Sequence, residues 1–118
     1  MPDLTPTTPI ITSASHVDQT LRAAIKGEID LHNSPELRGG LLDLLTKSSA
    51  KKLVLNLGQV PYMDSSAVAV LVELLQKLRK TGGKIYLTQL QPRVKGLLEI
   101  ARLNTIFQIC ATDEEAMK

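Results

Sequence analysis

The chain has 118 residues, which is the length of one ordinary domain, and 43% of them are hydrophobic and 22% charged. These values exclude a disordered chain, and no stretch approaches the roughly 18 apolar residues of a membrane span, so we expect no direct membrane insertion. A net charge of +2 and only two Tyr and one Phe give little basis for nucleic-acid binding. Because the N-terminus also lacks the order of a signal peptide, we expect a cytoplasmic protein.

Residues 1–9 carry Pro2, Pro6 and Pro9 among threonines and show no apolar periodicity, which is typical of a flexible N-terminal tail. We therefore place the domain at residues 10–118 and expect removal of residues 1–9 to leave stability nearly unchanged. A first strand is predicted over 10–17, followed by a turn at Asp18-Gln19. Residues 21–30 alternate apolar and polar side chains, which predicts a second strand with one buried face.

Three amphipathic helices are predicted in the rest of the chain. The first has Ser34 as its N-cap, Pro35 after it, and leucines at helical spacing to about residue 47. The second begins at Asp64 or Ser65 and runs to about residue 80, before Gly82-Gly83. The third runs from residue 92 to a C-cap at Asn104.

Short apolar runs over 51–57, 84–89 and 106–110 predict three further strands. Thr112 and Glu115 form a T-x-x-E capping box, which predicts a short terminal helix. The resulting order ββαβαβαβα predicts a single α/β domain whose mixed sheet has an initial hairpin and parallel strands joined by crossover helices.

Sequence signals for catalysis or for a bound cofactor are missing. His16 and His32 do not lie at metal-ligand spacing from each other or from Cys110, which we expect to be a small buried residue. Neither a phosphate-binding glycine motif nor a G-x-S-x-G nucleophile motif occurs. We therefore expect a protein that is not an enzyme and that uses no metal or cofactor.

The segment Tyr62-Met63-Asp64-Ser65-Ser66 lies between a predicted buried strand and the longest amphipathic helix. Strand-to-helix loops are where α/β proteins place functional groups. A purely structural interpretation is also open, since Asp64 or Ser65 can act simply as a helix N-cap. The short segment does not decide between these interpretations.

Three blocks of the sequence resemble the bacterial anti-sigma factor antagonists, which are built on the STAS domain. The blocks are residues 27–30 with 34–37 (GEID and SPEL), residues 63–66 (MDSS) with the helix behind them, and residues 102–107 (RLNTIF). Their order and spacing match the family over about residues 10–117. The resemblance implies a STAS-like domain, in agreement with the order of elements predicted from periodicity.

The resemblance also implies a function and a set of site residues. It implies that Ser65 is phosphorylated by a serine kinase that is also the anti-sigma factor, and that a serine phosphatase removes the phosphate. The unphosphorylated form would bind the anti-sigma factor through Asp30, Asp64, Ser65, Ser66 and Ala67 and would release it on phosphorylation. The family usually has glycine where this chain has Ala67, a change that favours a helix by about 1 kcal/mol.

Two other functions remain open at this point. Small STAS proteins also occur as regulatory or structural subunits of lipid-transport ATPase complexes in membranes, although the intact Asp64-Ser65-Ser66 motif favours the antagonist. A nucleotide-binding or nucleotide-hydrolysing enzyme is the last alternative, because the chain has no phosphate loop.

Overall fold

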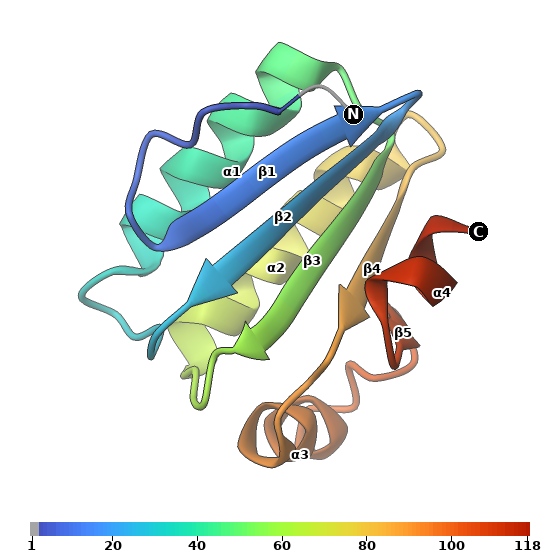
Figure 1. Cartoon of the computed structure of the whole chain (residues 1–118). Coiled ribbons are helices and arrows are strands. Elements are labelled where there is room, and N and C mark those ends of the chain that lie inside the picture. The colour runs from blue at the N-terminus through green and yellow to red at the C-terminus, as the bar shows by residue number, and fades with distance from the viewer. Residues whose placement is uncertain (1–2) are drawn as a thin grey trace.

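The computed structural model describes residues 3–118 and confirms the element order ββαβαβαβα (Figure 1). Five strands form one sheet in the order β1-β2-β3-β4-β5. The strands are β1 (Ile11–Val17), β2 (Thr20–Lys26), β3 (Lys52–Gln59), β4 (Lys84–Thr88) and β5 (Gln108–Cys110). The pair β1–β2 is antiparallel and the other three pairs are parallel, which confirms the predicted hairpin and crossover connections.

Four helices surround this sheet (Figure 1). Their bounds are α1 (Ser34–Ser48), α2 (Ser65–Arg79), α3 (Pro92–Ile100) and α4 (Asp113–Met117). The long helices α1 and α2 pack against each other and cover one face of the sheet, whereas α4 contacts β3, β4 and β5 on the opposite face. The chain enters α3 at the carboxyl end of β4, so α3 lies beyond the same edge of the sheet at which α2 begins.

The core lies between the sheet and the two long helices. Alternating leucines of β3 point toward these helices, because successive side chains of a strand face opposite sides. They meet leucines at helical spacing on α1 and α2, and burying each such side chain contributes about 1.5–3 kcal/mol. The largest fully buried side chains of this layer include Leu41, Leu44, Leu53, Leu55, Leu57, Leu71 and Leu74.

A buried polar cluster connects α4 to the opposite face of the sheet. Arg22 of β2 donates a hydrogen bond to Asp113 at 2.6 Å, Asn56 of β3 donates at 3.2 Å, and Thr88 of β4 donates through its hydroxyl. Burial by itself raises the pKa of the Asp113 carboxyl, but these hydrogen bonds outweigh it, so the pKa lies below its ordinary value. The ionised carboxylate thus attaches α4 to three strands.

Several predicted boundaries were wrong by a few residues. The strand predicted to reach Asp30 ends at Lys26, because Gly27 has φ of +89°, a conformation that interrupts a strand. Helix α1 takes Asn33 rather than Ser34 as its N-cap. Helix α3 ends at Ile100, four residues before the predicted C-cap.

Cys110 is partly exposed at the end of β5, whereas the sequence predicted a buried residue. The strand β5 is only three residues long and lies at the edge of the sheet, so less of the molecule covers it. Cys110 is the partner of Thr88 in the parallel pairing of β4 and β5.

The N-terminal segment, predicted as a loose tail, lies against the domain from residue 3 onward. The Leu4 amide donates to the Ala14 carbonyl oxygen at 3.0 Å, and the Leu4 side chain packs partly buried against the core. Thr8 is only 7% exposed, and its hydroxyl donates to the Glu36 carboxylate of α1. Residues 1 and 2 lie outside the described part of the chain.

Candidate functional site

Two chain segments far apart in the sequence meet at the carboxyl end of the sheet. Beyond Gly27 the chain pairs once more with the segment after β3, in a parallel bridge between Ile29 and Met63. The Ile29 amide donates to the Tyr62 carbonyl oxygen, and the Asp64 amide donates to the Ile29 carbonyl oxygen, both at 3.0 Å. Asp30 and Asp64 directly follow the bridged residues, so the bridge brings the two acidic residues together at the carboxyl end of the sheet.

Asp64 is the N-cap of α2, as the sequence allowed. Its Oδ1 accepts hydrogen bonds from the Ser66 amide at 2.9 Å, the Ser66 hydroxyl at 2.5 Å and the Ala67 amide at 3.4 Å. Its Oδ2 accepts from the Leu31 amide at 3.0 Å, which ties the loop after β2 to the start of α2. The hydrogen bond from the Ser66 hydroxyl, followed by those from the three amides, lowers the pKa of the Asp64 carboxyl below its ordinary value.

The two serines of the motif differ in what their hydroxyl groups do. Ser66 is partly buried and donates its hydroxyl to Asp64. Ser65 is exposed as the first residue of α2, and among the described residues its hydroxyl has no hydrogen-bond partner. The Ser65 hydroxyl is therefore the one that another molecule can reach at the N-terminus of the helix.

Ala67 does not lie on this surface. Its side chain is 0% exposed and belongs to the core, because the third residue of α2 faces the sheet. The expectation that Ala67 contacts a partner is therefore not supported, and the methyl group that replaces the family's glycine hydrogen is directed inward. The exposed neighbour one turn beyond Ser65 is Ala69.

The loop after β2 holds Asp30 next to Leu31, whose amide binds Asp64. The Asp30 carboxylate is exposed and accepts hydrogen bonds from the amides of His32 at 2.9 Å and Asn33 at 3.3 Å. The Asn33 side chain closes the loop by accepting from the Asp30 amide and donating to the Glu28 carbonyl oxygen. This loop presents Leu31, whose side chain is 75% exposed.

A groove that the sequence analysis did not predict adjoins Ser65 on its other side. It has a volume of about 550 Å³ and runs between the start of α2 and α3, lined by Tyr62, Met63, Asp64, Ser65, Arg93, Gly96, Leu97 and Ile100. The Arg93 guanidinium lies 4.7 Å from the centre of the Tyr62 ring, and Ile100 is 85% exposed. Ile100 lies outside the apolar spacing that buries one face of α3. An apolar residue at such a position was the sequence signal that could have indicated this surface.

Within residues 3–118, no cluster of three or more His, Cys, Asp or Glu side chains could hold a metal ion. In that same range, none of the helices has the length and apolar character needed to cross a bilayer. The site comprises a helix N-terminus with an accessible hydroxyl, two carboxylates and two exposed apolar side chains.

Comparison with protein families agrees with this description. The model of the STAS domain matches residues 12–116, which is most of the chain. The chain belongs to the STAS domain family. One relative of this STAS domain, the anti-sigma-B factor antagonist of Bacillus subtilis, is 32% identical over 82% of this chain and 87% of its own.

Solved structures show the same fold. The crystal structure of the Thermotoga maritima protein tm1081 superposes on this STAS domain with a TM-score of 0.82 and 25% identity, covering 88% of this chain and 89% of its own. The unphosphorylated anti-sigma factor antagonist SpoIIAA superposes with a TM-score of 0.76 and 23% identity, over 88% and 90%. A structure of the Bacillus SpoIIAA in its phosphorylated form has a TM-score of 0.68 and 22% identity, over 88% and 94%.

Proposed function

We propose that this STAS domain is an anti-sigma factor antagonist whose binding is controlled by phosphorylation of Ser65. In its unphosphorylated form it binds an anti-sigma factor that is also its serine kinase, and a serine phosphatase restores the bound form. The observation that carries the proposal is the difference between the two serines. The Ser65 hydroxyl is exposed and has no partner among the described residues, whereas Ser66 is engaged with Asp64.

The position of Ser65 explains how a phosphate can act on binding while folding is preserved. The N-terminus of a helix is the positive end of the helix dipole, so a negative group is tolerated there even though Asp64 already accepts from the amides of Ser66 and Ala67. The same phosphate adds a charge of about −1.5 to −2 to a surface that already carries Asp30 and Asp64. A partner shaped to fit a neutral hydroxyl would then meet like charges and an uncompensated desolvation cost.

Two exposed apolar side chains support a protein as the partner. Leu31 is presented by the loop whose amide binds Asp64, and Ile100 lines the groove that also contains Ser65. Both are largely exposed, at 75% and 85%. Apolar side chains that flank a polar centre are typical of the anchors of protein interfaces, which lose contact with water on binding.

The test uses full-length protein as bait in extracts of the source cells, in the variants Ser65→Ala and Ser65→Asp. An exposed serine on β1, changed in Ser13→Asp, is the matched control for an added carboxylate. We expect Ser65→Ala and Ser13→Asp to capture an ATPase of the histidine-kinase type and Ser65→Asp to lose it. The expected weakening is at least about 100-fold, because a charge buried without a partner costs several kcal/mol.

The outcome of this capture also separates the alternatives. Phosphate mapped to Ser66, or equal binding by Ser65→Asp and the wild type, would contradict the switch. Recovery of transporter subunits in place of a kinase would favour the membrane-complex alternative. Purified kinase with radiolabelled ATP should label the wild type but not Ser65→Ala.

A further inference from the structure

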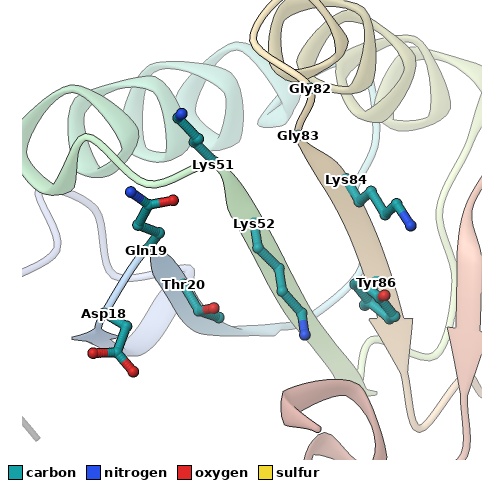
Figure 2. A pocket seen from close by; sticks show the side chains of 9 residues that line it. All are labelled: Asp18, Gln19, Thr20, Lys51, Lys52, Gly82, Gly83, Lys84 and Tyr86. Atoms are coloured by element: carbon teal, nitrogen blue, oxygen red, sulfur yellow. The ribbon is translucent and has the colours of Figure 1, made fainter.

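A second concave surface lies at the end of the sheet opposite Ser65, where the parallel strands begin (Figure 2). Its volume is about 550 Å³, and its lining residues are Asp18, Gln19, Thr20, Lys51, Lys52, Gly82, Gly83, Lys84 and Tyr86. Thr20, Lys52 and Lys84 are aligned partners on β2, β3 and β4, so they lie in one row across the sheet. They occupy the face that carries α4, on the part that α4 leaves uncovered.

This row sets two lysines side by side without an acidic partner. Lys52 and Lys84 are direct neighbours on parallel strands, which lie about 4.8 Å apart, and like charges so placed repel each other. Within residues 3–118 no carboxylate lies within ion-pair distance of either ammonium group. The arrangement therefore costs stability in the isolated molecule, and a bound anion would remove that cost.

On the other half of the same face, a cationic side chain is neutralised by a carboxylate of the protein itself. Two residues along β2 from Thr20, Arg22 is paired with Asp113 of α4. The row that contains Lys52 receives only an aromatic contact, since the Lys52 ammonium lies 4.5 Å from the centre of the Tyr86 ring. Figure 2 shows these two side chains on neighbouring strands, with Asp18 at the opposite margin from Lys84.

We propose that this concavity binds a small anion with two or more phosphate groups, held between the ammonium groups of Lys52 and Lys84. Lysine recognises phosphate as a compact point charge, and the volume lies within the range of small-molecule sites. The amides of Gly82 and Gly83 already donate to carbonyl oxygens of α2, so the lysine side chains supply the recognition. Lys51 lies on the rim and adds to the positive field.

The size and charge of the site favour a small anion over a macromolecule. The three lysines of the lining, offset by Asp18, give a net positive charge, which attracts a diphosphate group. The site lies at the amino ends of the parallel strands, whereas Ser65 follows the carboxyl end of β3. The inference is therefore independent of the proposed antagonist function.

The experiment titrates isotope-labelled full-length protein with inorganic pyrophosphate and follows the amide resonances at low salt and constant ionic strength. We expect saturable shifts confined to Thr20, Lys52, Lys84, Tyr86 and their neighbours. The double variant Lys52→Gln/Lys84→Gln should bind about 100-fold more weakly, because each of the two charge-assisted hydrogen bonds that are lost is worth about a factor of ten. Its thermal melting should show that it still folds.

The matched control, Lys26→Gln/Lys95→Gln, removes the same charge from exposed positions on β2 and α3. It should bind pyrophosphate like the wild type. Equal weakening of pyrophosphate binding in both double variants would mean that only the net charge of the protein attracts the anion, and it would overturn the proposal. Absence of saturation at millimolar pyrophosphate would also overturn the proposal, as would resonance shifts centred on Asp64. It would likewise be overturned if an oligoglutamate peptide bound tightly at this face and pyrophosphate did not.

Discussion

Substitution of Asp64 can separate its role in stability from the role of Ser65 in binding. Both of its oxygens accept hydrogen bonds, Oδ1 from the first turn of α2 and Oδ2 from Leu31. In Asp64→Asn one oxygen becomes an amide donor, so the variant can retain the helix cap or the tie to the loop but not both. In Asp64→Ala both are lost.

The expected magnitude follows from these contacts. Asp64→Ala removes both the N-cap of α2 and the hydrogen bond from the Leu31 amide, so it should lower Tm by several degrees, more than loss of a helix cap alone. Asp64→Asn should lose about half as much, whereas Ser65→Asp should melt like the wild type.

The pH dependence of this difference provides a second check. The pKa of Asp64 is lower in the folded than in the unfolded protein, so its contribution is complete above the unfolded pKa of about 3.9 and is lost as pH falls through the folded pKa. Urea unfolding of wild type and Asp64→Asn between pH 7 and pH 2.5 should give curves that converge below about pH 4. The contribution of Asp113 is common to both proteins and cancels.

An exposed carboxylate on α3, removed in Glu99→Gln, is the control and should change neither stability nor its pH dependence. A stability difference between wild type and Asp64→Asn that stays constant through the acid range would refute the assignment of the charge to the cap. Unchanged stability of Asp64→Ala would refute the role of both contacts.

Three further predictions concern other parts of the chain. Asp113→Asn should lower the free energy of unfolding by about 2–3 kcal/mol, because Arg22 loses its ion pair and one of the two oxygens that accept from Arg22, Asn56 and Thr88 becomes an amide donor. Amides of α4 should then exchange hydrogen faster, and unchanged exchange would mean that apolar contacts alone hold α4. Deletion of residues 1–9 should cost about 1–2 kcal/mol through Leu4 and Thr8, measured as Tm, and an unchanged Tm would favour the loose tail. Purified protein should not turn over ATP or GTP, and hydrolysis that copurifies with the chain and is lost on Ser65 substitution would contradict this.

Patterns local in the sequence determined the order of the elements and the start of α2. Leucines at helical spacing, glycines after helices and an alternating strand are each encoded within about 15 residues, and short-range geometry alone relates them to helix or strand. For the same reason the helix cap could be narrowed from the sequence to Asp64 or Ser65, and the structure shows that it is Asp64. The resemblance of three blocks then indicated the STAS domain, which the family match confirms.

The tertiary structure alone decided which groups meet across long stretches of chain. The bridge between Ile29 and Met63 brings the loop that contains Asp30 to Asp64, and Arg22 meets Asp113 across 91 residues. The register that aligns Lys52 with Lys84 is likewise a property of the sheet. Such pairings depend on strand order and register, which many distant side chains determine together through the packing of the core, so no local pattern in the sequence specifies them.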